Sequence, residues 1–326
     1  MNTTLCTDCE SPLTSRRAFL KTSATLLAGS ALPIIGAEPA KATGETLTAQ
    51  LFKSLTEEQR KKVCFGFDDP LRSKVDNNWM IVKQSVAEVF TPDQQALVRD
   101  IFNSLHSEEY RKPVFDQVAS DAESAGFETG TSVALFGEPG TGKFEFVLSG
   151  RHVTRRCDGD SVEGTAFGGP IFYGHAVKET EKPDHPGNAY WYQAKRANEV
   201  FQALDGKQRE QAMIEKGRAE NHSDTVKLTG KAEGLPGIPV GSLSADQKEL
   251  VKKVLADLLS PYRKADADEA MKLITARGLD ALHMAFAENG DLGNDSVWDV
   301  WQIEGPNMLW YFRGAPHVHC WVHVKA

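Results

Sequence analysis

The sequence predicts an α+β fold, with one or more antiparallel sheets flanked by several capped helices. Four segments carry the signature of a helix start, and two other regions carry runs of β-favouring residues separated by turns. Because the strands are grouped apart from the helices and do not alternate with them, antiparallel pairing is expected. We expect residues 43–326 to form a single domain of this class behind a leader of residues 1–42.

The four helix starts share one pattern: an apolar residue, then Thr, Asp or Ser, then Gln three positions later. The Thr, Asp or Ser side chain can accept hydrogen bonds from the first turn, and Gln can bond back to the cap. The pattern occurs at Thr56, Thr91, Asp205 and Ser244. Their spacings of 35, 114 and 39 residues are too irregular for a solenoid of short repeats. Further helices are predicted over residues 196–204 and 266–282.

The strand-favouring runs form two groups, each broken by turn residues. The first group comprises residues 131–136 and 143–149, and the second comprises residues 297–304, 308–313 and 317–324. Glycine and proline between the runs predict tight turns. The second group is therefore predicted to be an antiparallel meander.

The turn of the first group matches the core of a phosphate-binding loop. Residues 137–143 read Gly-Glu-Pro-Gly-Thr-Gly-Lys. A phosphate-binding loop needs Ser or Thr at the next position and a helix behind it, but Phe144 follows and begins a strand-like run. We therefore interpret the glycines as a hairpin turn and not as a nucleotide site.

Residues 1–42 have the features of a twin-arginine secretion signal. Arg16 and Arg17 form the arginine pair, and the apolar stretch after them is too short and too polar to span a bilayer. Ala40-Lys41-Ala42 supplies a cleavage site, so the mature chain is expected to begin near Thr43. We predict passage through the twin-arginine export machinery, a periplasmic or extracellular location, and no membrane span after cleavage. Since this route carries folded cargo, it favours a protein that takes up a metal before crossing.

Charge and cysteine content limit the possible partners and the number of disulfides. The chain carries 37 Lys+Arg and 45 Asp+Glu, and the leader removes 4 and 3 of these, which leaves a net charge of −9. This balance, without a clustered basic run, argues against nucleic acid as a partner. The pair Cys6 and Cys9 leaves with the leader. Cys64, Cys157 and Cys320 remain, an odd number that permits at most one disulfide.

The run from His317 to His323 is the most informative stretch for chemistry. Side chains alternate along a strand, so His317, His319 and His323 share one face with Trp321. A His-x-His pair on a strand places two imidazoles about 6–7 Å apart at the backbone, which suits chelation of one metal ion. Zinc and copper sites use three or four donors, so further ligands are expected.

His152 and His175 are the expected further ligands, because each lies where a strand is predicted to end. Glu304 is a candidate general base, and Arg151 or Arg313 a candidate clamp for an anionic group. The alternative is that these histidines are only hydrogen-bonded structural side chains, and that Glu304 and the arginines pair with one another. The other histidines, namely His106, His185, His222 and His283, are expected to be ordinary.

The chain resembles a family of exported bacterial proteins known as domain of unknown function 3500. The resemblance is carried, in order along the chain, by Leu55-Thr56-Glu57-Glu58-Gln59-Arg60, Phe67-Asp68-Asp69-Pro70 with Arg72, Gly150-Arg151-His152, residues 169–174, Ile303-Glu304-Gly305-Pro306 and Pro316-His317-Val318-His319. It implies an exported α+β protein and no particular activity. It also implies histidines at the positions of His152, His317 and His319 and a different residue at His323, which makes His323 a weaker candidate ligand.

Three classes of function remain open. The first is an exported metal-binding protein with zinc or copper at His152, His175, His317 and His319, a zinc- or copper-dependent enzyme if a coordination position stays open for an unknown small-molecule substrate. The second is a non-enzymatic binding module for a sugar or peptide. Its groove would be lined by Trp298, Trp301, Trp310, Tyr311 and Trp321. The third is a structural envelope protein, favoured only by the scarcity of nucleophile motifs.

Overall fold

The structure is a computed structural model that describes residues 43–121, 126–176, 185, 187–290 and 297–326. The predicted leader lies outside the described residues. The described residues belong to one compact unit. None of the helices within these ranges combines the length and the apolar character needed to cross a membrane.

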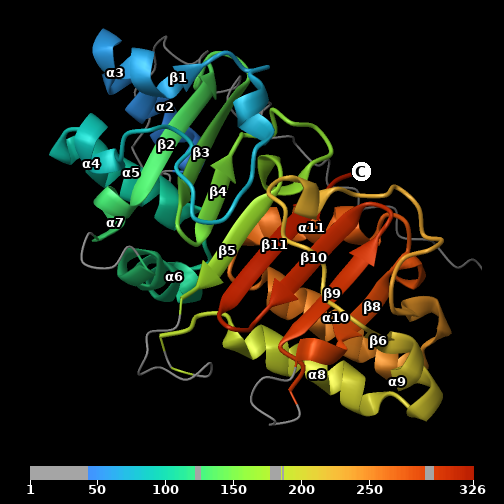
Figure 1. Ribbon diagram of the computed structural model, residues 1–326. Helices are drawn as coiled ribbons and strands as arrows, with labels where there is room; N and C mark the ends of the chain where they lie inside the picture. Colours follow the sequence, from blue (N-terminus) through green and yellow to red (C-terminus); the bar gives the residue numbers. More distant parts are fainter. Residues whose placement is uncertain (1–42, 122–125, 177–184, 186, 291–296) are drawn as a thin grey trace, which may run out of the picture. The chain divides into compact units, whose positions relative to one another are not determined.

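The described residues contain one mostly antiparallel sheet of eleven strands (Figure 1). The strands are β1 (Cys64–Phe65), β2 (Thr131–Gly137), β3 (Phe144–Gly150), β4 (Val153–Cys157), β5 (Ile171–His175), β6 (Met213–Ile214), β7 (Ile238–Pro239), β8 (His283–Ala287), β9 (Val300–Gly305), β10 (Met308–Arg313) and β11 (Val318–Val324). Their order is β1-β2-β3-β4-β5-β11-β10-β9-β8-β6, and β7 pairs with β8. The predicted meander is β9 to β11, and residues 137–143 are confirmed as the turn between β2 and β3.

The predicted α+β class is confirmed, and helices precede each group of strands. They are α2 (Gly44–Ser54), α3 (Glu57–Val63), α4 (Val86–Val89), α5 (Pro92–Ser104), α6 (Glu108–Asp121), α7 (Gly126–Gly130), α8 (Trp191–Ala203), α9 (Gly206–Ala212), α10 (Ala245–Leu259) and α11 (Lys264–Thr275). All four predicted helix starts, at Thr56, Thr91, Asp205 and Ser244, are capping boxes in which Gln bonds back to the cap.

The capping glutamines also bond to one another in pairs. Gln59 Nε2 donates to Gln94 Oε1 at 2.7 Å, and Gln94 Nε2 donates to the carbonyl of Ser54 at 3.0 Å. Gln208 Nε2 donates to Gln247 Oε1 at 3.1 Å, and Gln247 Nε2 donates to the carbonyl of Ala203 at 2.8 Å. Each pair therefore joins two helix starts and the end of the preceding helix. The similar spacings of 35 and 39 residues reflect one arrangement that occurs twice.

The strand order shows the same duplication across the sheet. β1 to β5 form one half, β6 and β8 to β11 form the other, and the halves meet in the antiparallel pair of β5 with β11. In each half the outer two-residue strand runs parallel to its neighbour and the remaining pairs are antiparallel. The turns after β3 and β9 have the same length, with Gly150 opposite Val153 and Gly305 opposite Met308. The two halves are thus related by an approximate two-fold axis.

The registers locate this axis. Val153 pairs with Tyr173 in one half and Met308 pairs with Val324 in the other, so Tyr173 and Val324 are counterparts. Two residues earlier, Ile171 and Val322 are counterparts that pair directly with each other. Among the helices, His106 and Tyr262 form a bridge at the equivalent points before α6 and α11. The axis therefore passes through the centre of the sheet and through the junction of these helices.

The two faces of the sheet are covered differently. In Figure 1, α8, α10 and α11 lie behind β8 to β11, and the segment after β1 crosses the other face. Arg156 on β4 donates to the carbonyls of Arg72 and Lys74 in that segment, and His323 on β11 bonds to the carbonyl of Val226 after β6. One face thus packs against helices, and the other packs against two long connecting segments.

Several aromatic side chains that were candidates for a groove belong to the core instead. Trp301, Trp310, Tyr311 and Trp321 are each 2% exposed or less, and Trp298 is partly buried. Trp310 Nε1 donates to the Tyr173 hydroxyl at 2.8 Å inside the core. Side chains buried in this way do not line a binding groove.

Three elements differ from the predictions. The helix predicted over residues 266–282 ends at Thr275, because Gly278 adopts a φ of +85° and turns the chain toward β8. β8 and β4 were not predicted. β4 escaped notice because Arg155 and Arg156 interrupt its apolar pattern, although both are buried.

A partly buried ion pair ties the first described helix of one half to the last helix of the other. Arg263 Nη2 donates to Glu45 Oε1 at 2.6 Å, and Arg263 Nε donates to Asp266 Oδ2 at 2.6 Å. Burial alone would raise the pKa of Glu45, but the hydrogen bond and the charge of Arg263 outweigh burial and lower it to about 2. Because the folded pKa lies below the usual 4.5, the stabilisation is complete above that value and is lost as pH falls toward 2.

We expect Glu45→Gln to lower the free energy of unfolding at pH 7 by about 3 kcal/mol, since lowering the pKa of a carboxyl group from 4.5 to about 2 corresponds to roughly this amount. At pH 3 more than half of the difference should be lost. Urea denaturation of both proteins at the two pH values measures it. Glu58→Gln, which removes an exposed pair with Lys61, should leave stability near that of the wild type. An equal effect of Glu45→Gln at both pH values would contradict the assignment.

Candidate metal centre

Three of the four histidines expected to bind metal converge at one end of β11. His319 Nε2 lies 3.1 Å from His152 Nε2 and 2.9 Å from His317 Nε2, and the three candidate ligand atoms all lie within 4.8 Å of one another. His152 occupies the turn between β3 and β4, His317 precedes β11, and His319 lies within it. His152 and His319 are buried, whereas His317 is partly exposed.

The sheet brings His152 to the other two across β5. Gly174 on β5 pairs in register with His319 on β11, and its backbone N–H donates to the carbonyl of His152 at 3.1 Å. A Cβ at position 174 would lie 3.0 Å from His152 Cδ2 and 2.1 Å from the Val318 carbonyl oxygen. Only glycine therefore leaves room for the His152 ring to reach over this strand.

Carboxylates hold two of the three imidazoles. His152 Nδ1 bonds to Asp121 Oδ2 at 2.5 Å, and His319 Nδ1 bonds to Glu220 Oε2 at 2.6 Å. An ionised carboxylate only accepts hydrogen bonds, so this network assigns the proton of each ring to Nδ1 and leaves a lone pair on Nε2. The two Nε2 lone pairs then face each other at 3.1 Å. A metal cation bound to both Nε2 atoms would remove this repulsion, because each lone pair would then be donated to the metal.

Glu220 is itself fixed by a second partner. Arg313 Nε donates to Glu220 Oε1, and Arg313 Nη1 donates to the Ala315 carbonyl at 3.0 Å. Burial would raise the pKa of Glu220, but His319 and Arg313 together lower it below its usual range. Glu220 therefore remains an acceptor at neutral pH. Arg313, a candidate anion clamp from the sequence, here positions the carboxylate that orients His319.

The surroundings keep His317 and His319 neutral. Burial, followed by the neighbouring His319 and His152, lowers the pKa of His317 to about 4. Burial also lowers the pKa of His319, although Glu220 acts in the opposite direction. The Phe172 ring lies 5.2 Å from the His319 ring and 6.2 Å from the His152 ring, between centroids, and forms an apolar wall. Neutral imidazoles in such a setting are the form that binds a metal.

The spacing of the three nitrogens suits a small divalent ion. Zn–N bonds of about 2.0–2.1 Å at tetrahedral angles would place two nitrogens about 3.3–3.4 Å apart. The contacts of 2.9 and 3.1 Å lie a few tenths of an ångström below this separation. Three imidazole donors leave one further position, and partly exposed His317 marks the side from which water or a ligand can reach it.

The remaining predicted site residues lie elsewhere. His175 pairs in register with Val318, so its side chain lies on the face of the sheet opposite His317 and His319. Glu304 is level with His323, four residues or about 13 Å along the strands from His319. Glu304 accepts from Arg218 Nη2 at 2.5 Å. Arg151 is exposed in the turn beside His152, and its carbonyl accepts from Asn78. His175, Glu304 and Arg151 are not part of the histidine group.

Asp121 and Glu220 escaped the sequence analysis. They are separated from their histidines by 31 and 99 residues, and acidic residues are common in the chain. Asp121 gave no signal in the sequence, since its burial at the end of α6 is seen only in the structure. Glu220 lies in an irregular segment between β6 and the short helix Asp224–Val226, where periodicity gives no information.

The fold and the site define an α+β protein with a duplicated half-sheet and a buried three-histidine group held by carboxylates. The family model described as "Protein of unknown function (DUF3500)" matches residues 37–324, and the chain belongs to this family. No curated protein and no solved structure matches the chain.

We expect Gly174→Ala to destabilise the protein by about 1–3 kcal/mol, because the added methyl group would overlap the Val318 carbonyl and press on His152. Chemical denaturation measures the loss. The matched control is Gly206→Ala at the start of α9, where a Cβ meets nothing within 4 Å. If both substitutions have the same effect, close packing at Gly174 is not what holds His152 in place.

Proposed function

We propose that this protein binds one divalent transition metal, with zinc as the best fit, through His152, His317 and His319. The observation that supports this most directly is the opposed pair of Nε2 atoms on His152 and His319, each on a ring whose Nδ1 is bonded to a carboxylate. Carboxylate–histidine pairs of this kind orient metal ligands in proteins and raise their basicity. A purely structural pair of histidines has no need of two lone pairs that face each other.

The donor set favours a catalytic over a structural metal. Structural zinc sites have four protein ligands, whereas catalytic sites have three and keep one position for water or substrate. When bound, zinc would lower the pKa of a coordinated water to about 7 and so supply a nucleophile for hydrolysis. Asp121 and Glu220 would hold the two buried imidazoles in place, and Phe172 would exclude water from one side. We therefore propose a metal-dependent hydrolase acting on a small substrate.

Export fits this proposal. The twin-arginine leader expected over residues 1–42 would carry the chain across the membrane after folding, so the metal could be inserted first. We propose that the protein works in the periplasm or outside the cell.

Elemental analysis and zinc titration of the purified protein test the proposal. We expect about one equivalent of metal in the wild type and less than a tenth of an equivalent in a variant that carries both His152→Ala and His319→Ala, since only His317 would remain as a ligand. His323→Gln is the matched control, because it lies on the same strand and face but bonds to the Val226 carbonyl. A wild-type protein that binds no transition metal, or a double variant that binds as well as wild type, would refute the proposal.

Replacement of the two carboxylates by amides gives a second test of the proposed metal site. We expect Asp121→Asn and Glu220→Gln each to weaken zinc affinity about 10- to 100-fold, because the amides cannot hold the imidazole proton as strongly. Competition with a fluorescent chelator measures the affinity, and circular dichroism checks the fold. Asp116→Asn serves as the control, since it lies on the same helix but pairs with Lys112 at the surface. Unchanged affinity in both amide variants would show that the carboxylates only stabilise the fold.

A further inference from the structure

A second feature lies on the same face of the sheet, where a pocket of about 270 Å³ opens between the start of β5 and the end of β11. Its basic lining residues are Arg72, Arg156, Lys227, His323 and Lys325, and none of its lining residues is Asp or Glu. At about 30 Å³ per water molecule, it has room for about nine waters. The pocket is therefore cationic and larger than a single ion needs.

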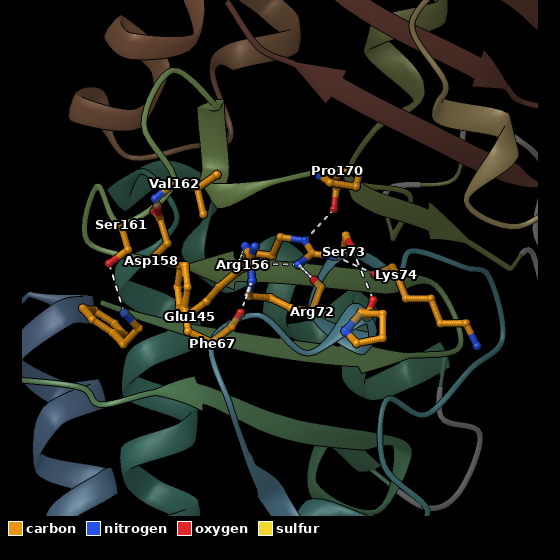
Figure 2. A network of polar contacts seen from close by, with 12 residues as sticks. Phe67, Arg72, Ser73, Lys74, Glu145, Arg156, Asp158, Ser161, Val162 and Pro170 are labelled. Atoms are coloured by element: carbon orange, nitrogen blue, oxygen red, sulfur yellow. Dashed lines mark hydrogen bonds and ion pairs between the residues drawn. The ribbon is translucent and has the colours of Figure 1, made fainter. Parts of the chain in front are cut away.

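An ion cluster of Glu145 with Arg72 and Arg156 adjoins the pocket, since both arginines also line it (Figure 2). Glu145 accepts from Arg156 Nη1 at 2.6 Å through Oε1 and from Arg72 Nη1 at 2.9 Å through Oε2. Glu145 is fully buried, and the Arg156 side chain is 1% exposed. One carboxylate thus faces two guanidinium groups, and the Arg72 side chain is 21% exposed, so the second guanidinium is open to an anion from solvent.

Arg156 and Arg72 differ in how many of their guanidinium N–H groups are hydrogen-bonded. Arg156 is anchored by the carbonyls of Pro170, Arg72 and Lys74, which fixes its position. Arg72 Nε donates to the Phe67 carbonyl at 2.7 Å, but its Nη2 donates to none of the residues that the structure describes. Arg72 therefore lines the pocket with a guanidinium that is held in place and still has a donor group to spare, an arrangement suited to phosphate, sulfate or carboxylate oxygens.

The two-fold relation of the halves places this pocket at the counterpart of the metal centre. The turn registers equate His152 with Asn307. The offset between Tyr173 and Val324, extended back along the chain, matches His317 with Ala166 and His319 with Gly168, which lie in the short helix Ala166–Gly168 before β5. Both turn residues reach the C-terminal end of the adjacent helix, since His152 bonds to Asp121 on α6 and Asn307 donates to the Leu273 carbonyl on α11. Small residues thus stand where the other half has two imidazoles. Gly168 lines the pocket, and the Asp158 side chain packs against it, since a Cβ at position 168 would lie 2.9 Å from Asp158 Cβ.

We propose that this pocket binds a small anion, or the anionic group of a small ligand, through Arg72 and the lysines at its rim. Lys325 and Lys227 are exposed there, with Lys227 paired to Asp224 at 2.8 Å. The duplicated fold then offers two binding positions on one face: a metal centre in one half and an anion site in the other. The anion site does not depend on the metal proposal, because it shares no residue with the histidine group.

Isothermal titration with inorganic phosphate, sulfate and succinate tests this, and glucose serves as the uncharged control. We expect saturable one-to-one binding of at least one anion and no binding of glucose. Combining Lys227→Gln with Lys325→Gln should weaken binding about tenfold or more, while both substitutions are at the surface and leave the buried cluster intact. Lys207→Gln with Lys231→Gln, at exposed positions outside the pocket, is the matched control and should bind as the wild type does.

Two further outcomes separate the pocket from the metal centre. An anion that binds to a metal would lose its site in His319→Ala, whereas the pocket should retain its affinity in that variant. The proposal is overturned if none of the three anions binds saturably at millimolar concentration. It is also overturned if binding is lost in His319→Ala, or if the variant with both pocket lysines replaced binds as tightly as wild type.

Discussion

The antiparallel pairing of β5 with β11 is the interaction on which the rest of the structure depends. It joins two half-sheets of equal topology at Ile171 and Val322, and it is the only strand pair in the described sheet that connects the halves. The same pairing sets Gly174 beside His319, so that His152 can cross a strand without a side chain in its way. A shift of one residue in this register would turn His317 and His319 to the helix-covered face. The candidate site therefore exists only if the two halves dock correctly.

Much of the fold could be predicted from sequence because its signals are local. The capping boxes at Thr56, Thr91, Asp205 and Ser244 and the meander of β9 to β11 depend on residues within a few positions of one another. β4 could not be predicted in this way, since its buried arginines are satisfied by distant carbonyls. The duplication was also hidden, because its halves share capping residues and registers but little side-chain identity.

The candidate site likewise combines features that local sequence predicts with features that depend on long-range contacts. His317 and His319 are two residues apart on one strand, so alternation alone places them together, and strand-end geometry suggested His152. His175 also lies at the end of a strand. The face of the sheet on which its side chain lies depends on its pairing with Val318, which is distant in the sequence. Asp121 and Glu220 come from other parts of the chain, and only the folded structure shows that each meets the Nδ1 atom of a histidine. The residue types of the candidate site were readable from sequence, and their orientation was not.

Cys64, Cys157 and Cys320 are free thiols, and burial raises the pKa of each, to about 11 for Cys64. A thiol with a raised pKa forms little thiolate, so it reacts slowly with oxidants and with disulfides. None of the three contributes a covalent link, and the described fold is complete without one. The described residues can therefore fold under reducing conditions, and an oxidising environment would add no disulfide that this fold requires.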